Sequence, residues 1–292
     1  MTVRKIFAAV IVTLLSASCG MGNVDVYVLA RSGSPKQLKE AVRKGADFSV
    51  RCSFMEGDTG LFDEDETPLH IAAAYNRNAE SIRIIASQGL DVNAEAGSGN
   101  SICGTPLSCA VQHKNITAAG VLLELGAAPD GWTFSGWYSG TAFHDVAAWY
   151  DDKESAREII SKLIKAGGNV NVHEEDNDTA KFAREEIKTL KDELKPGPGE
   201  SADGDTRHVL VRKNTEFSRA GWLNFSASCT PLIFAVLYDN PDAVNILLDF
   251  GADAGIKSAE GKNACDYAEE LPGNSRLRKS PAYVRLKRAV CD

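Results

Sequence analysis

The chain has 292 residues, of which 43% are hydrophobic and 25% are charged, as in a folded protein rather than a disordered chain. Its net charge of −8 argues against nucleic acid as a partner, because binding to phosphates needs a concentrated basic surface. The length allows one or two globular domains or one elongated array.

The N-terminal segment predicts export. Arg4 and Lys5 precede an apolar run at 6–15, and small residues follow at 16–18. The run is shorter than the roughly 20 apolar residues that span a bilayer. A positive start, a short apolar run and small residues before a cleavage point are typical of a secretory signal peptide. We therefore expect residues 1–18 to be removed and the protein to reach the periplasm or cell envelope.

The end of this segment also predicts a lipid anchor. The stretch LSASC resembles a bacterial lipobox, which implies lipidation of Cys19, although Ser16 stands where that pattern prefers leucine. Ordinary cleavage after Ser18 is the alternative. Loss of residues 1–18 removes two positive charges and no negative ones, so the net charge changes from −8 to −10.

Export would place the cysteines in an oxidising compartment, where disulfide bonds form. We expect Cys265 to pair with Cys291 in the terminal unit, and Cys52 to pair with Cys103, since both precede a repeat. Cys109 falls at a helix position and is expected to be a buried thiol. Cys229 has no obvious partner. No Cys-x-x-Cys or Cys/His grouping has zinc spacing, so we expect no metal.

One phrase recurs along the chain, and a second phrase follows it each time. The first reads ETPLHIAAAYN at 66–76, GTPLSCAVQHK at 104–114, GTAFHDVAAWY at 140–150 and CTPLIFAVLYD at 229–239. The second is an apolar stripe of helical spacing that ends at a glycine. These glycines, expected to be left-handed helix caps, are Gly45, Gly89, Gly126, Gly167 and Gly251. The unit is therefore a helix, a short turn, a second helix and a glycine stop.

The two phrases together resemble the ankyrin-repeat family. The resemblance implies an all-α solenoid of stacked helical hairpins with projecting loops, in which each hairpin needs its neighbours to bury its apolar face. A threonine is expected to cap each first helix, and proline suits its first turn. The resemblance makes His70 and His144 structural residues that hold the turn by hydrogen bonds.

The phrases also divide the chain. We expect a signal peptide at 1–18, an N-terminal cap repeat at 19–50, repeats 1–3 at 51–178, a degenerate repeat or insertion at 179–228, repeat 4 at 229–260 and a C-terminal cap repeat at 261–292. The pattern itself breaks at 174–228, which we interpret as an irregular insertion. The acidic run at 173–178 lacks the ligand spacing of a calcium loop and is interpreted as a solvated loop.

Motifs of catalysis are missing from the sequence. It has no glycine-rich phosphate loop, no GxSxG and no HExxH. The repeat phrases already account for most of the Cys, His and Asp residues. We therefore predict no catalytic residues, no cofactor and no enzymatic activity.

A recurring position favours protein binding instead. The residue eight places after each repeat threonine is Tyr75, His113, Trp149 or Tyr238. In the ankyrin family this position lies at the end of the first helix, faces the concave groove and varies with the partner. Four ring side chains there predict a ladder of contacts for a partner. The alternative is that the rings pack against neighbouring repeats as part of the framework.

The segment at 130–140 is the second candidate for partner contact. Its glycine density marks a turn or a tight hairpin. The family resemblance makes it a loop over the concave side, and large exposed aromatic residues are typical interface anchors. The candidate anchors are Trp132, Phe134, Trp137 and Tyr138. The alternative is that these rings fold back against the insertion, where Trp222 and Phe225 lie.

These patterns predict a non-enzymatic module that binds a partner protein on its concave face and reaches the membrane only through an N-terminal lipid anchor. The alternative is an inhibitor or immunity-type protein that neutralises a secreted enzyme or toxin, since a net charge of −10 would steer it to a basic target.

Overall fold

The computed structural model describes residues 26–51, 66–96, 103–135, 138–173, 226 and 228–291. Within these ranges the chain forms two compact units, Met1–Ala128 and Pro129–Asp292. The predicted signal peptide, Cys19, Cys52, Trp137 and nearly all of the insertion lie outside the described residues.

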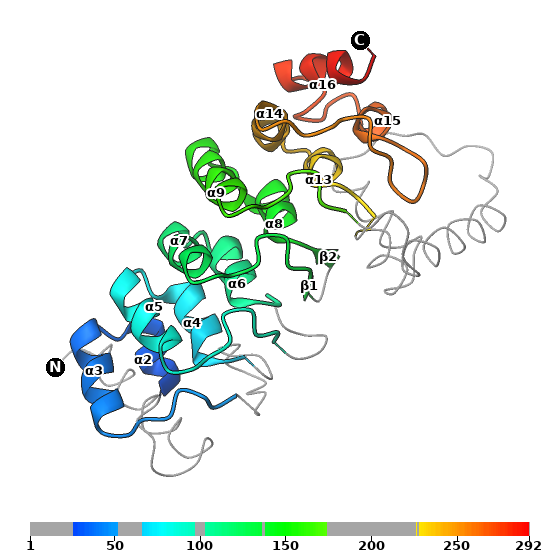
Figure 1. Ribbon diagram of the computed structural model, residues 1–292. Helices are drawn as coiled ribbons and strands as arrows, with labels where there is room; N and C mark the ends of the chain where they lie inside the picture. The colour runs from blue at the N-terminus through cyan, green and yellow to red at the C-terminus, as the bar shows by residue number, and fades with distance from the viewer. Residues whose placement is uncertain are drawn as a thin grey trace, which may run out of the picture. The chain divides into compact units, whose positions relative to one another are not determined.

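The first unit consists of three helical hairpins. They are α2 (Val26–Ser32) with α3 (Pro35–Arg43), α4 (Pro68–Tyr75) with α5 (Ala79–Ala86), and α6 (Pro106–Gln112) with α7 (Ile116–Glu124). The first helices α2, α4 and α6 pack in succession, and so do the second helices α3, α5 and α7 (Figure 1). The unit therefore has two helical layers with the core between them, as the sequence predicted.

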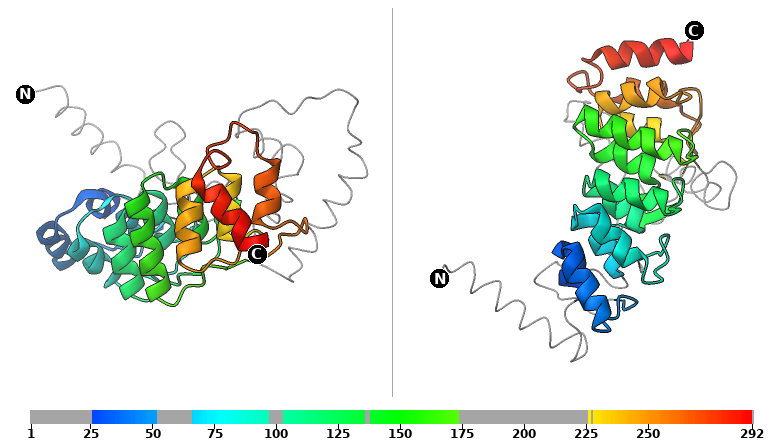
Figure 2. Two further views of the ribbon diagram at one scale, coloured as in Figure 1. Left: turned by 90° about the horizontal axis from the view of Figure 1, so that it is seen from above. Right: turned by 60° about the vertical axis from the view of Figure 1, so that its left-hand side comes forward.

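The second unit repeats this arrangement and adds a short hairpin of strands. Its elements are β1 (Thr133–Ser135), β2 (Tyr138–Gly140), α8 (Ala142–Trp149), α9 (Lys153–Lys165), α13 (Pro231–Leu237), α14 (Pro241–Asp249), α15 (Ala264–Glu270) and α16 (Pro281–Cys291). Helices α8, α13 and α15 pack in succession, as do α9, α14 and α16 (Figure 2). The strands are antiparallel, with Ser135 opposite Tyr138, which confirms a tight hairpin.

The ends of the helices follow the sequence closely. Thr67, Thr105, Thr141 and Thr230 are the N-cap residues of α4, α6, α8 and α13. The five predicted stop glycines have φ between 82° and 95°, a conformation that is costly for residues with a Cβ atom. The all-α hairpin repeat is thus confirmed at both ends of its helices.

The two repeat histidines are buried, as their structural role requires. His144 Nδ1 accepts a hydrogen bond from the Thr141 N–H at 3.0 Å, and its Nε2–H donates to the Cys229 carbonyl at 2.8 Å. His70 Nδ1 accepts from the Thr67 N–H at 3.1 Å. Burial lowers the pKa of each histidine to about 4, so both imidazoles are neutral at physiological pH.

Buried asparagines join successive hairpins, which the sequence analysis did not anticipate. Asn115 caps α7, and its Nδ2 donates to the carbonyls of Ala73 and Asn76 in the preceding repeat, both at 2.8 Å. Asn240 does the same in the second unit, where Nδ2 donates to the Ala147 and Tyr150 carbonyls. Each such side chain satisfies backbone groups of two repeats. Since an unpaired buried carbonyl would destabilise the fold, these hydrogen bonds stabilise the contact between adjacent hairpins.

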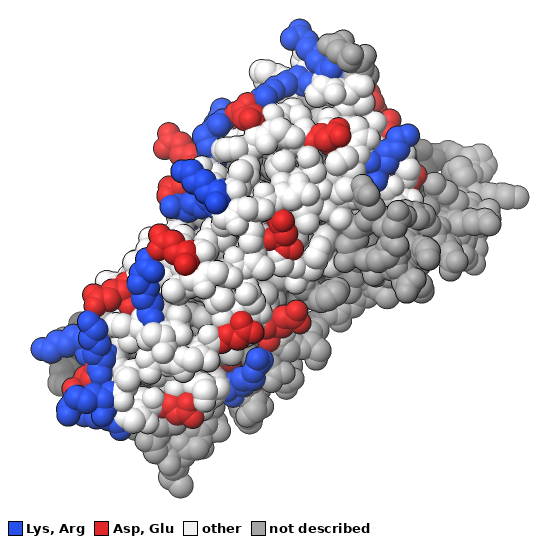
Figure 3. Space-filling view, in the orientation of Figure 1, with Lys and Arg blue, Asp and Glu red and all other residues white. Residues whose placement is uncertain are grey.

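The second helices carry rows of ion pairs. Figure 3 shows charged side chains of both signs along the side of the second helices, with fewer charges over the rest of that face. Lys39 pairs with Glu80 and Arg83 with Glu124 in the first unit. Asp249 pairs with Arg157 and Arg285 in the second unit. These exposed pairs contribute little stability individually, but they neutralise the outer surface of each stack.

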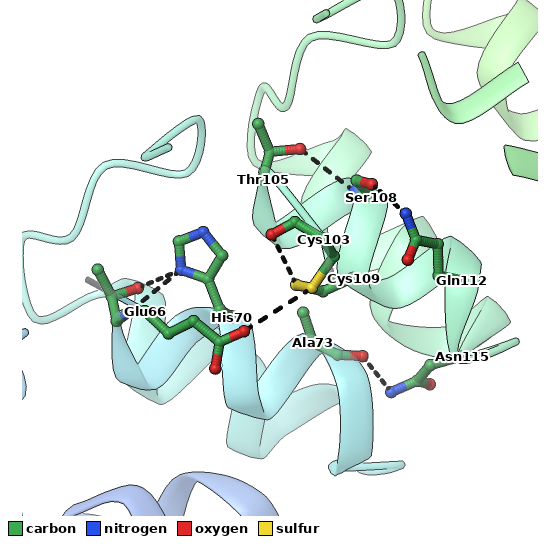
Figure 4. The surroundings of a disulfide bond; sticks show 10 residues. Glu66, His70, Ala73, Cys103, Thr105, Ser108, Cys109, Gln112 and Asn115 are labelled. Carbon is green, nitrogen blue, oxygen red and sulfur yellow. Dashed lines mark hydrogen bonds between the residues drawn. A yellow bond between two sulfur atoms is a disulfide. The ribbon is translucent and has the colours of Figure 1, made fainter. Parts of the chain in front are cut away.

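The cysteine predictions were wrong. Cys103 is bonded to Cys109, with 4.9 Å between their Cα atoms, so Cys103 does not pair with Cys52 and Cys109 is not a thiol (Figure 4). The two residues meet because the loop that carries Cys103 folds against the first turn of α6, where Cys109 lies. Cys265 is buried and keeps its thiol, so the predicted bond to Cys291 is not formed.

Candidate functional site

The predicted ring positions form one aromatic pair in each unit. In the first unit, Tyr75 at the end of α4 lies against His113, the C-cap of α6. Their ring centroids are 4.8 Å apart, and the planes are inclined by 61°. Both side chains are half-buried. Contact between equivalent positions of adjacent repeats is the arrangement predicted for a ladder, and also for its framework alternative.

The second unit holds Trp149 against Tyr238. Their centroids are 5.7 Å apart at 63°, and Tyr238 also stacks on the buried Phe234 at 5.6 Å. Burial and the neighbouring Asp145 raise the pKa of the Tyr238 hydroxyl, so the ring stays neutral. Trp149, by contrast, is 45% exposed, and Leu125 and Val284 are the other exposed large apolar residues in the described ranges. Tyr238 thus supports the ring of an exposed Trp149.

Arginines surround the first pair, which the sequence analysis did not note. The Arg31 guanidinium lies over the Tyr75 ring, 4.3 Å from its centroid. Arg77 donates to the carbonyls of His113 and Lys114 at 3.1 and 3.0 Å. Burial, Arg77 and Arg31 together lower the pKa of His113. We call Arg31, Tyr75, Arg77 and His113 the arginine cluster.

Among the predicted anchors of the strand hairpin, the structure describes the side chain of Trp132. Trp132 is half-buried, and its ring lies 5.5 Å from that of the buried His144. Part of the Trp132 side chain therefore packs on the framework of its own repeat. Phe134 and Tyr138 lie on β1 and β2, but their side chains, and all of Trp137, fall outside the described residues. Their role as anchors stays a prediction.

Potential metal ligands meet at one place within the described ranges. Side-chain atoms of Glu66, Cys103 and Cys109 lie within 4.8 Å of one another. Because the two sulfur atoms are bonded to each other, they are not available as thiolate ligands.

As for bilayer insertion, none of the helices described here combines the length and apolar character required to cross a membrane.

Comparison with known families identifies the repeats. A family model described as ankyrin repeats (3 copies) matches residues 26–131, and one described as ankyrin repeats (many copies) matches residues 223–268. Together the two matches cover just over half of the chain.

Individual relatives share this repeat but are longer. A putative palmitoyltransferase of Danio rerio is 26% identical over 251 residues, which are 85% of this chain and 32% of that protein. A human mitochondrial disaggregase is 28% identical over 220 residues, 74% of this chain and 26% of that protein. The chain thus spans about a third or less of these relatives.

A solved structure has a similar fold over nearly the whole chain. It is a chain of the complex between a predatory endopeptidase from Bdellovibrio bacteriovorus and an immunity protein. The similarity covers 89% of this chain and 96% of that one, with a TM-score of 0.50 and 19% identity. At this identity the likeness concerns the fold.

Proposed function

The chain belongs to the ankyrin-repeat family, and from this premise we propose that it is a non-enzymatic module that binds a partner protein through the ends of its first helices. The observation that carries the proposal is the exposed Trp149, held against Tyr238. Tryptophan and tyrosine are enriched among the residues that dominate binding energy at protein interfaces. An exposed tryptophan on a supported ring offers a partner a large and rigid apolar contact.

The same proposal places the protein in the cell envelope, with Cys19 as its lipid anchor. The support comes from the apolar run at 6–15 and from the Cys103–Cys109 bond. Disulfide bonds persist in oxidising compartments such as the periplasm and are rare where thiols are kept reduced. An exported protein can therefore retain this bond.

Capture from an envelope extract tests the proposed function. The bait variant Tyr75→Ala/Trp149→Ala removes one ring from each aromatic pair. The control Leu125→Ala/Val284→Ala removes the other two exposed large apolar residues. Circular dichroism first checks that both variants remain folded. We expect the control to recover the wild-type partner and the ring variant to lose it. Equal recovery by both baits would overturn the proposal.

A second candidate function is that of an inhibitor or immunity-type protein. It is favoured by the likeness to a chain in an endopeptidase–immunity protein complex. Loss of residues 1–18 would leave a net charge of −10, which would speed association with a basic enzyme. This candidate predicts a single captured partner, bound one to one with nanomolar affinity, whose enzymatic activity falls on binding. A captured protein whose activity is unchanged would reject it.

A further inference from the structure

The arginine cluster holds two cations, Arg31 and Arg77, that have no carboxylate partner within the described part of the chain. Among the residues that the structure describes, neither Arg31 nor Arg77 forms an ion pair, although this unit pairs Lys39 with Glu80 and Arg83 with Glu124. The whole chain has more acidic than basic residues. Two arginines that meet no carboxylate among the described residues carry a local positive charge that an anionic group could bind.

The geometry of the cluster holds these cations in place. The Arg31 guanidinium lies 4.3 Å from the Tyr75 ring centroid, within the range of a cation–π interaction. Arg77 is fixed by two carbonyl groups, those of His113 and Lys114. Two of its N–H groups are used there, and guanidinium carries five such donors. Both side chains are therefore ordered while donors remain for a ligand.

The cluster also adjoins the proposed contact surface. Tyr75 and His113 form its aromatic floor and occupy the repeat position expected to meet a partner. Arg31 is half-buried and Arg77 is exposed, so both are reachable. Arginine recognises carboxylates through paired hydrogen bonds, with a specificity that a lone positive charge lacks.

From this arrangement, and resting on the proposed function, we infer that the arginine cluster is a carboxylate-binding subsite for an acidic segment of the partner protein. Arg31 and Arg77 donate to the carboxylates of that segment, and the Tyr75 ring supports its aliphatic side-chain carbons. His113 lies beside the bound carboxylates.

His113 supplies a readout that is specific to this subsite. Burial lowers the pKa of His113, and so do Arg77 of the turn between α4 and α5 and Arg31 of α2, while Lys114 is the adjacent charged residue at the end of its own helix. A bound carboxylate offsets these cations and so raises the pKa of His113. The site is thus detectable in the side-chain nuclear magnetic resonance signal of one histidine.

The test titrates the mature chain with capped hexaglutamate and capped hexaglutamine. We expect hexaglutamate to bind and to raise the pKa of His113, and hexaglutamine to do neither. Because the chain is acidic overall, non-specific electrostatic repulsion opposes binding of the acidic peptide. An identical response to the two peptides, or no response to either, would overturn the inference.

Variants locate the binding. Arg31→Gln/Arg77→Gln should weaken hexaglutamate binding by about tenfold or more, because two charge-assisted contacts are lost. Lys39→Gln/Arg83→Gln removes two cations from ion pairs of the same unit and should leave the affinity unchanged. Arg31→Lys/Arg77→Lys keeps the charge and should retain part of the binding. Equal affinity of the two glutamine variants would contradict the inference.

The capture experiment separates this inference from the proposed function. If Arg31→Gln/Arg77→Gln retains the envelope partner while Tyr75→Ala/Trp149→Ala loses it, the acidic-segment inference fails and the proposed function stands. Loss with both variants supports the inference, whereas retention by both overturns the proposed function as well.

Discussion

His70 and His144 occupy the same place in their repeats, and burial makes neutrality a condition of folding for both. Each imidazole accepts the N–H of its repeat threonine, which requires an unprotonated Nδ1. Their pKa is about 4 in the folded chain against 6.5 ordinarily. The unfolded chain therefore binds more protons between these two values, and stability falls as pH decreases through this window.

The free energy of unfolding should consequently depend on these two histidines in mild acid. Lowering the pH from about 7.5 to about 5 should cost about 2 kcal/mol per histidine, from the shift in pKa between the two states. Urea unfolding of His70→Gln/His144→Gln should show a smaller pH dependence than wild type. Each single variant, His70→Gln or His144→Gln, should remove about half of the dependence, because one buried imidazole remains. A dependence unchanged by the double variant would contradict this explanation.

The cysteines show the limit of inference from single residues. The sequence predicted a compartment in which disulfide bonds can form. It could not predict which cysteines pair, because pairing depends on the path of the loop before α6, and the spacing of cysteines does not determine that path. The structure places the Cys103 backbone 4.9 Å from that of Cys109 and buries both. The repeat histidines, by contrast, were assigned correctly because the phrase around them fixes their local geometry.

Peptide mapping under non-reducing conditions should find Cys103 linked to Cys109. Reduction, or the variant Cys103→Ser/Cys109→Ser, should lower the free energy of unfolding by about 2 kcal/mol, the value expected for a loop this short. The serine variant should not respond to the reductant, which separates this bond from other effects. A peptide that joins Cys52 to Cys103 would contradict the structure.

At the scale of elements, helix positions were predictable because each hairpin carries its own start and stop signals. The threonine caps and the glycine stops act within one turn of chain, so sequence determines them locally. The links between hairpins depend on residues of different repeats. Asn115 bonds to carbonyls near the end of α4, which could have been suspected only by aligning the repeats and noting Asn76, Asn115 and Asn240 at nearly equivalent places.

Two helix caps of the first unit give a matched comparison of these roles. Asn115→Ala should lower the free energy of unfolding by about 3 kcal/mol, because it removes a cap and leaves two buried carbonyls unpaired. Asn78→Ala should cost about 1 kcal/mol, because exposed Asn78 caps α5 through the Ser81 N–H and bridges no repeat among the residues described. Chemical denaturation measures both. Equal losses would show that the bridge contributes nothing beyond capping.

At the scale of the whole molecule, the sequence predicted the repeat fold but not the setting of its candidate site. The ring positions were found by counting from the repeat threonines, and the structure brings them together in pairs. Arg31 lies on a hairpin that lacks the first repeat phrase. Counting residues from the repeat threonines therefore could not predict that Arg31 contacts Tyr75. The packing of Trp132 on His144 also depends on tertiary structure, since a glycine-rich segment can fold outward or inward.

Export also concerns the molecule as a whole and has its own prediction. The mature protein should begin at Cys19 and carry a lipid, as measured by intact mass and by incorporation of labelled fatty acid. Cys19→Ser should abolish the label without changing the helical content, since the repeats begin after this segment. A mature mass that begins at residue 19 without lipid would support simple secretion instead.

The central claim is that a partner protein contacts the ends of the first helices, and site-specific photo-crosslinking tests it most directly. A benzophenone amino acid at Gln112 or Ala148 lies beside an aromatic pair, whereas one at Ser87 or Lys165 lies at the end of a second helix. The account predicts that a partner from the envelope is crosslinked from Gln112 and Ala148 and not from Ser87 or Lys165. Crosslinks from the second-helix positions alone would contradict it.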